Sequence, residues 1–286
     1  MANAPRYLVI DGYTKAGRDE LAAGGASVAG DLYARMLAAW SPPGSECDII
    51  YPADPDSRLP AGADLAQYDG IAWTGCSLTI YEDVPEVRRQ VELCRAAYEA
   101  QVPSFGSCWA AQIAVVAAGG RCAANPRGRE MGIGRKMTLT AEGRGHPMYD
   151  GKIGVFDAFI SHVDEVTHLP PGAVLLASNA FSTVQAVAVT HRGGAFWAVQ
   201  YHPEYDLHEM ARLVFCRIEK LKSLGFFRDR DAALDYVNLL EALHQDPERY
   251  DIAWKLGIDS DVMNEDVRQI EVRNWIERQV LPNMRV

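Results

Sequence analysis

Several features are absent from this chain of 286 residues, and each absence excludes a class of protein. No run of about 18 apolar residues occurs, so no segment is expected to span a bilayer. The N-terminus offers only the apolar run 7–10, which is too short for a signal peptide. Basic runs are also missing and the net charge is −10, so we expect neither nucleic acid nor membrane as a partner. These absences predict a cytoplasmic protein.

Signatures of metal and nucleotide sites are missing as well. The six cysteines, at positions 47, 76, 94, 108, 122 and 216, lack the paired spacing of disulfide frameworks and zinc sites. This scatter fits a reducing compartment. No Gly-x-x-x-x-Gly-Lys-Ser/Thr loop is present to hold phosphates. We therefore expect no metal and no cofactor, and any ATP-dependent step would require a second protein.

The hydrophobic pattern predicts an α/β fold. In the first 120 residues, strand-like runs at 7–11, 48–51, 71–74 and 102–106 alternate with helical runs at 28–40, 84–100 and 109–118. Such alternation indicates a parallel sheet with helices on both faces. Short strands follow at 136–140, 155–161, 174–178, 185–190 and 196–201, with hairpin-like turns between them. We expect that half of the sheet to be mixed or antiparallel, followed by a helix over 207–223.

One cysteine lies between a predicted strand and a predicted helix. Residues 106–112 read Gly-Ser-Cys-Trp-Ala-Ala-Gln and lead into an Ala-rich helical segment. Cys108 is thus at a strand-to-helix corner, the geometry of a nucleophile elbow. The helix N-terminus favours the thiolate, and the free N–H groups that follow, beginning with that of Trp109, are able to bind an oxyanion. A buried structural cysteine explains this segment alone equally well.

A histidine and a carboxylate follow another predicted strand. His202, Pro203 and Glu204 come directly after the run 196–201. Pro203 favours an extended conformation at His202, and residues i and i+2 of an extended chain point to the same side. Glu204 is therefore expected to orient the imidazole and to stabilise its protonated form. Taken alone, the three residues also fit a surface turn; together with Cys108 they form a candidate triad.

These motifs resemble those of the class I glutamine amidotransferases, which carry a Cys-His-Glu triad. The family pattern Gly-x-Cys-x-Gly-x-Gln matches at Gly106, Cys108 and Gln112. It departs at Ala110, where the family usually has glycine. The family's His-Pro-Glu motif matches at residues 202–204.

Two further segments carry the resemblance. Residues 161–166, Ser-His-Val-Asp-Glu-Val, are similar to the Ser-His-x-Asp-x-Val segment of the GMP synthase glutaminase domain, which lines the glutamine pocket. Residues 73–77 take the place of the Gly-rich oxyanion loop, in a variant similar to that of stand-alone proteins related to this glutaminase domain. We expect Cys76, in this loop, to be a packing residue. The resemblance covers about residues 5–225 and implies a flavodoxin-like mixed, mostly parallel sheet.

The resemblance also implies roles for the matching residues. The Cys108 thiolate would attack a γ-carboxamide, His202 would protonate the leaving nitrogen, and Glu204 would orient the ring. The N–H groups of Gly75 and Trp109 would hold the oxyanion. Four side chains would shape the pocket for the glutamyl group: Gln112, Ser161, His162 and Asp164.

Three functions stay open. The first is cysteine-dependent hydrolysis of glutamine, or of a γ-glutamyl amide or peptide, through a γ-glutamyl thioester. The second is a glutaminase subunit that donates ammonia to a separate synthetase. The third is a degenerate binding or regulatory module, for which Ala110 is the only support. A small molecule is the expected substrate, and either a synthetase or a second copy of the chain remains an open partner.

The last 61 residues differ from the rest. We divide the chain into an amidotransferase-like domain, 1–225, and a helical C-terminal extension, 226–286. Helices are expected near 229–245, 247–256 and 261–280, with Tyr250, Trp254 and Trp275 as large apolar side chains that need a surface. The purely structural interpretation is that these helices pack on the main domain. The functional interpretation is that they form a lid over the pocket or a surface that binds a partner.

Overall fold

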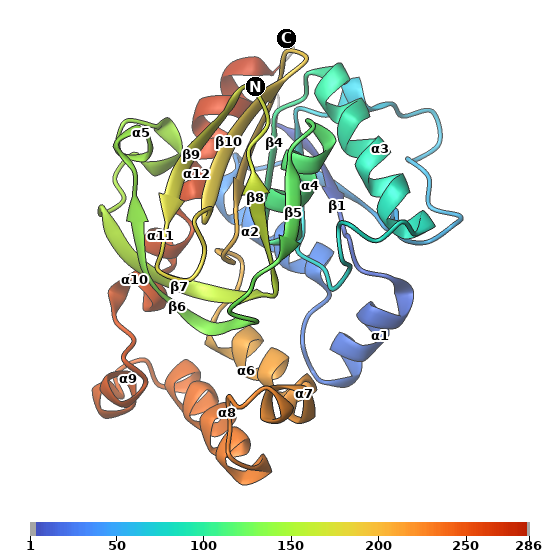
Figure 1. The fold of residues 1–286 in the computed structure, drawn as a ribbon. Helices are drawn as coiled ribbons and strands as arrows, with labels where there is room; N and C mark the ends of the chain where they lie inside the picture. Colours follow the sequence, from blue (N-terminus) through green and yellow to red (C-terminus); the bar gives the residue numbers. More distant parts are fainter. Residues whose placement is uncertain (1–3, 285–286) are drawn as a thin grey trace.

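The computed structural model describes residues 4–284, and in this part of the chain nine strands form one sheet (Figure 1). Five strands pair in parallel, in the order β2 (Glu46–Ile50), β1 (Arg6–Ile10), β3 (Gly70–Trp73), β4 (Ser104–Ser107) and β11 (Gly194–Val199). Four antiparallel strands continue the sheet, in the order β10 (Ala186–His191), β9 (Ala173–Ser178), β6 (Glu130–Leu139) and β7 (Val155–His162). The expected α/β class and the change from parallel to antiparallel are confirmed.

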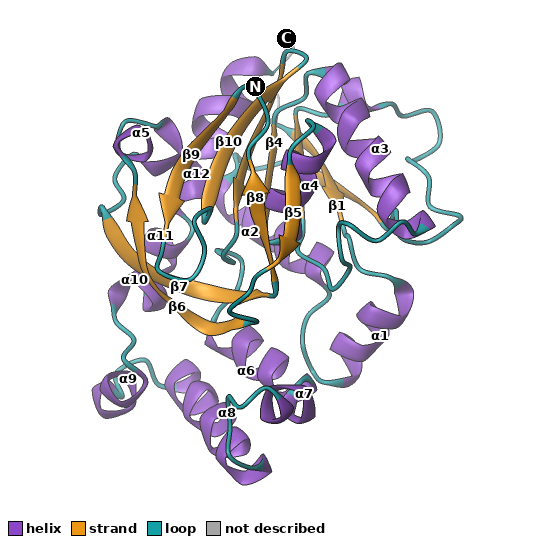
Figure 2. Cartoon of the chain, in the orientation of Figure 1, coloured by secondary structure: helices purple, strands orange, loops and turns teal. Residues whose placement is uncertain are grey.

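Helices cover both faces of the sheet (Figures 1 and 2). On one face, α3 (Pro85–Ala100) and α4 (Trp109–Ala117) pack in a core that includes Leu8 of β1. On the other, α2 (Ala29–Trp40) packs in a core that includes Val9. Successive side chains of a strand point to opposite faces, so a strand buried on both faces reads as the continuous apolar run seen in the sequence.

Some elements depart from the sequence-based expectation. Helix α1 (Lys15–Ala23) and the two-stranded sheet of β5 (Arg121–Ala124) with β8 (Asp164–His168) were not expected. In α1 only Leu21 is buried, so the helix has almost no apolar stripe to detect. The helix expected over 207–223 is interrupted at Arg217.

The interrupted segment and the extension form a series of short helices. α6 (Leu207–Cys216) and α7 (Ile218–Ser223) precede α8 (Arg230–Gln245), which packs against α6 below the sheet in Figure 1. The prediction of a single helix over 261–280 was wrong. After α9 (Tyr250–Leu256), this segment contains α10 (Ser260–Met263), α11 (Glu265–Arg268), α12 (Ile270–Trp275) and a π-helix (Ile276–Val280). A short helix α5 (Ala141–Arg144) precedes β7. The division at residue 225 stays a prediction.

The three aromatic residues of the extension have different environments. Trp275 is fully buried, with its ring 6.0 Å from that of Tyr7 and 5.9 Å from that of Phe105. Trp254 is 82% exposed and Tyr250 is 64% exposed, so the expectation that all three are covered was wrong for these two. The end of the chain therefore completes one of the two cores of the sheet.

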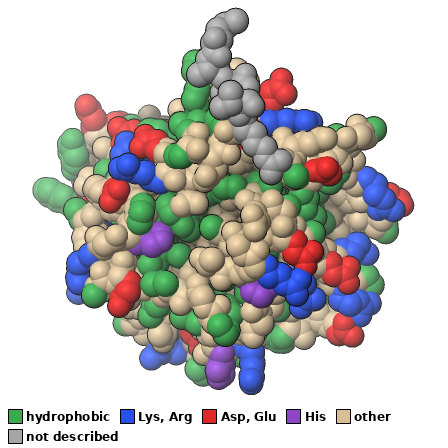
Figure 3. Space-filling model, turned by 90° about the horizontal axis from the view of Figure 1, so that it is seen from above, with side chains coloured by type: hydrophobic (Ala, Val, Ile, Leu, Met, Phe, Trp, Pro, Cys, Tyr) green, Lys and Arg blue, Asp and Glu red, His purple; other side chains and the backbone are tan. Residues whose placement is uncertain are grey.

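Charged side chains are dispersed on the surface. On the face in Figure 3, Lys and Arg side chains are interspersed with Asp and Glu, and the described atoms form no continuous patch of one sign. Among residues 4–284, none of the helices combines the length and the apolar character that crossing a bilayer requires.

The buried Trp275 and the exposed Trp254 give a matched test of how the C-terminal helices pack on the sheet. We expect Trp275→Ala to lower the free energy of unfolding by about 3–5 kcal/mol, because it leaves a large cavity between the extension and the sheet. Trp254→Ala should change it by no more than about 0.5 kcal/mol. Urea unfolding followed by circular dichroism measures both. Equal effects would show that the C-terminal segment does not contribute to the core.

Candidate active site

Cys108 occupies a strained corner between β4 and α4. Its φ of 53° and ψ of −100° are outside the regions that side-chain-bearing residues favour, and its backbone N–H donates to the Val199 carbonyl at 2.7 Å. Gly106 makes the corner possible. A Cβ at Gly106 would lie 2.4 Å from the Trp73 carbonyl oxygen and 2.4 Å from the methyl group of Ala110. The strand-to-helix elbow expected from the sequence is present.

The same contact accounts for the departure from the family pattern at Ala110. This side chain is fully buried behind the elbow and faces the glycine at position 106. Because Gly106 has no Cβ, the methyl group occupies space that is otherwise empty. Ala110 is therefore accommodated without moving Cys108.

His202 and Glu204 lie together beside Cys108, but not for the reason argued from the sequence. β11 ends at Val199, and residues 202–205 form a turn in which the Tyr205 N–H donates to the His202 carbonyl at 3.4 Å. The chain turns at Pro203 and Glu204, so the alternation of an extended strand is not what brings the two side chains together. The turn brings His202 Nδ1 to 2.7 Å from Glu204 Oε1, and both side chains are almost fully buried.

Further hydrogen bonds hold the Glu204 carboxylate in place. The Ser107 hydroxyl donates to Glu204 Oε1 at 2.9 Å, and the Tyr33 hydroxyl donates to the Ser107 oxygen at 2.6 Å. The Tyr205 ring stacks on the imidazole of His202 with centroids 4.0 Å apart. These neighbours fix the carboxylate and the ring at once. Sequence reasoning missed Ser107 and Tyr33, although Ser107 adjoins the cysteine.

The surroundings of His202 favour the imidazolium form. Burial of the ring lowers its pKa, but the charges of Glu204 and Cys108 outweigh burial and raise the pKa of His202 to about 9. The second ring nitrogen, Nε2, is buried and has no hydrogen-bond partner among the described residues. The ring is therefore charged at neutral pH, with one N–H available for a ligand.

Two backbone N–H groups next to the sulfur lack protein acceptors. Trp109 is the first residue of α4, and in the described part of the chain neither its N–H nor that of Gly75 donates to a protein atom. A Cβ at Gly75 would lie 2.9 Å from His202 Cε1 and 3.3 Å from Cys108 Cβ. Only glycine allows this approach. The geometry suits the expected oxyanion role of both groups, which stays a prediction.

A cavity of about 240 Å³ opens in front of the sulfur. It is lined by six of the residues singled out from the sequence: Cys108, Gln112, Ser161, His162, Asp164 and His202. Tyr81, which the sequence suggested for the pocket mouth, lines it too, as do four large residues for which the sequence gave no binding role: Tyr13, Arg129, Tyr205 and Arg217. Asp164 is its only carboxylate among the described residues, and it accepts a hydrogen bond from Tyr81 at 2.9 Å.

The predicted pocket residues are fixed by one another. Gln112 Nε2 donates to the Asp164 carbonyl at 3.4 Å, and His162 Nδ1 lies 2.9 Å from the same oxygen. The Ser161 carbonyl accepts from the Cys108 thiol at 3.5 Å. Ser161, His162 and Asp164 thus form one continuous wall next to the nucleophile.

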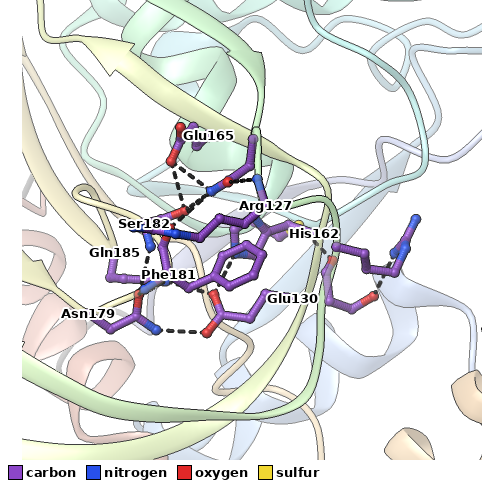
Figure 4. Close-up of polar contacts among 12 residues, drawn as sticks. Arg127, Glu130, His162, Glu165, Asn179, Phe181, Ser182 and Gln185 are labelled. Atoms are coloured by element: carbon purple, nitrogen blue, oxygen red, sulfur yellow. Dashed lines mark hydrogen bonds and ion pairs between the residues drawn. The ribbon is translucent and has the colours of Figure 1, made fainter. Parts of the chain in front are cut away.

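A polar network behind this wall supports His162 (Figure 4). Glu130 Oε2 lies 3.0 Å from His162 Nε2 and accepts from Gln185 at 3.0 Å, while Glu130 Oε1 accepts from Asn179 at 2.7 Å. The Phe181 ring meets the imidazole edge-on at 5.9 Å. Both ring nitrogens of His162 therefore have protein partners, and its expected role in binding the substrate stays a prediction.

Cys76 does not share the environment of Cys108. Burial raises the pKa of the Cys76 thiol well above its ordinary value, so this sulfur stays protonated. This agrees with the expected packing role.

Comparison with known proteins assigns the chain to a family. The model of class I glutamine amidotransferases matches residues 46–220. The chain belongs to the class I glutamine amidotransferase family. The chain is 35% identical over 243 residues to a γ-glutamyl-L-1-hydroxyisopropylamide hydrolase of Pseudomonas sp., with 82% of this chain and 80% of the relative covered. It is 28% identical over 162 residues to γ-glutamyl peptidase 3 of Arabidopsis thaliana, with 56% and 64% covered.

Solved structures agree on the fold. A glutamine amidotransferase of Thermotoga maritima superposes on this chain with a TM-score of 0.66 and 16% sequence identity, covering 97% of this chain and 99% of that one. The match extends through the C-terminal helices as well as the sheet.

The titration of His202 tests the charge state of the site. We expect the ring to titrate near pH 9 by NMR, and at lower pH in Glu204→Gln, because the carboxylate charge that raises the pKa is then absent. The pKa in the folded protein lies above the ordinary 6.5. The charged ring therefore stabilises the fold fully below pH 6.5, and this stabilisation is lost as the pH rises through 9. A midpoint near 6.5 in the unmodified protein would contradict the arrangement.

Proposed function

We propose that this protein hydrolyses a γ-glutamyl amide, with Cys108, His202 and Glu204 as its catalytic triad. The observation that carries the proposal is the buried His202–Glu204 pair at 2.7 Å, beside a cysteine that lines a cavity of about 240 Å³. Similarity to a γ-glutamyl amide hydrolase over 82% of the chain supports the substrate class.

The first half of the reaction forms a thioester. The Cys108 thiolate attacks the γ-carbonyl carbon, a C–S bond forms, and the carbonyl oxygen becomes an oxyanion bound by the N–H groups of Gly75 and Trp109. The His202 imidazolium donates its Nε2 proton to the amide nitrogen. The C–N bond then breaks and the amine leaves, while Glu204 holds the ring in the required orientation.

The second half releases glutamate. The neutral His202 ring takes a proton from a water molecule, whose oxygen attacks the thioester carbon. The same two N–H groups bind the second oxyanion. Collapse of this intermediate breaks the C–S bond and restores the thiolate and the imidazolium. No ATP and no second protein enters either step.

The wall of the cavity supports a glutamyl substrate. Asp164, held by Tyr81, supplies a negative charge for an α-ammonium group. Gln112 closes the wall next to it through its bond to the Asp164 carbonyl. Tyr81 is 53% exposed, so this part of the wall borders the solvent-open mouth of the cavity, through which the amine leaves.

An amine-release screen tests the proposal. We expect hydrolysis of at least one compound among glutamine, γ-glutamyl methylamide and γ-glutamyl-glycine, without ATP, because the site contains all groups that the two steps require. Cys108→Ala should abolish release, whereas Cys47→Ala, which removes another free thiol on β2, should retain it. Inactivity on the whole panel that is relieved only by an added synthetase would instead favour an ammonia-donating subunit.

Substitutions of the triad residues should lower kcat/KM by different amounts. His202→Ala removes both proton donor and base, so kcat/KM should fall roughly 100- to 10,000-fold. Glu204→Gln retains shape but removes the charge that stabilises the imidazolium, so its loss should be smaller. A glutamine-like diazoketone should label Cys108 and not Cys76, as read by peptide mapping. Labelling of Cys76, or an unchanged rate in His202→Ala, would contradict the triad.

A further inference from the structure

Two arginines of the cavity point at one oxygen atom. Arg217 Nη1 donates to the Ser161 hydroxyl oxygen at 2.9 Å, and Arg129 Nη1 lies 3.4 Å from the same oxygen. They come from distant parts of the chain. Arg129 precedes β6, and Arg217 lies at the break between α6 and α7, where its φ of −112° and ψ of 14° interrupt the helix. The fold therefore brings two guanidinium groups to one point of the cavity wall.

Neither of these two arginines forms an ion pair among the described residues. Asp164 is the one carboxylate that lines the cavity, and its charge and that of Cys108 raise the pKa of Arg129 by less than the opposing effects lower it. Arg129 Nε is buried and has no hydrogen-bond partner in the described part of the chain. Burial and the nearby Arg217 lower the pKa of the Arg129 guanidinium, the direction expected for adjacent charges of the same sign. An arrangement with two unmatched cations favours an anionic ligand.

The pair is close to the reacting sulfur. Ser161 receives both guanidinium groups on its hydroxyl, while its carbonyl accepts the Cys108 thiol at 3.5 Å. The arginines and the sulfur therefore contact the same residue, so a group bound by the arginines lies on the part of the cavity wall that adjoins the nucleophile.

We propose that Arg129 and Arg217 together bind a carboxylate group of the substrate and so determine which γ-glutamyl amides react. The two planar guanidinium groups present several N–H donors in the geometry that matches the two oxygens of a carboxylate. This inference rests on the proposed hydrolase function. The carboxylate is either the α-carboxylate of the glutamyl unit or a carboxylate on the leaving amine, as in a γ-glutamyl dipeptide.

Four amides separate the two sources. γ-Glutamyl-glycine carries both carboxylates, γ-glutamyl methylamide only the α-carboxylate, 4-aminobutyryl-glycine only that of the amine, and 4-aminobutyryl methylamide neither. We expect Arg217→Gln and Arg129→Gln to lower kcat/KM roughly 10- to 100-fold for substrates with the bound carboxylate. For the matching substrates without it, the variants should remain close to the unmodified protein. The pattern of losses identifies the source.

Control variants exclude a general effect of losing an arginine. Arg144→Gln changes an exposed arginine of α5 that does not line the cavity, and it should leave all four rates unchanged. Arg217→Lys retains the charge without the fork of donors, so it should recover part of the loss. Thermal unfolding confirms that each variant is folded. Equal losses on all four amides by both arginine variants would overturn the carboxylate site.

A binding measurement keeps this inference distinguishable from the proposed function. Calorimetry of the four amides with the Cys108→Ala protein requires no turnover. If the unmodified protein hydrolyses none of them but the preference for a carboxylate disappears in Arg129→Gln and Arg217→Gln, the site stands and the hydrolase function fails. If hydrolysis occurs without any carboxylate preference in rate or affinity, the function stands and the site fails.

Discussion

The parallel pairing of β4 with β11 is the constraint on which the candidate site depends. Ser107 and Val199 are partners in this ladder, and the Cys108 N–H extends it by donating to the Val199 carbonyl at 2.7 Å. Parallel strands end at the same edge of a sheet, so the cysteine and the histidine emerge side by side although they are 94 positions apart in the sequence. The hydrogen bond from Ser107 to Glu204 at 2.9 Å then closes the arrangement.

The C-terminal helices also help to hold the candidate active site in place. Glu271 of α12 accepts the Tyr201 hydroxyl at 2.6 Å and pairs with the buried Lys152 at 2.9 Å. Tyr201 is the residue directly before His202. A carboxylate buried among these partners is stable only while all of them remain in place, because an unpaired buried charge is costly. The extension therefore holds the turn of His202 from behind, in addition to filling the core with Trp275.

Many residues of the candidate site could be predicted from the sequence, because they belong to short local motifs. The cysteine elbow and the His-Pro-Glu segment can be recognised from adjacent residues, and the segment 161–164 from its similarity to the GMP synthase glutaminase domain. Arg129 and Arg217 could not be predicted, since neither belongs to a motif and only the tertiary fold brings them to Ser161. The exposure of Trp254 could not be predicted for a related reason. Its apolar character indicates a preference for burial, but the fold decides whether a surface is available to cover it.

The central claim is that the sulfur of Cys108 becomes covalently bound to the glutamyl group during turnover. It is tested most directly by mixing the protein with γ-glutamyl methylamide, quenching in acid within the first turnovers, and mapping the peptides by mass spectrometry. The account predicts a γ-glutamyl thioester on the peptide that contains Cys108, and none in Cys108→Ala. Amine release without an adduct on this peptide, or an adduct on another residue, would contradict it.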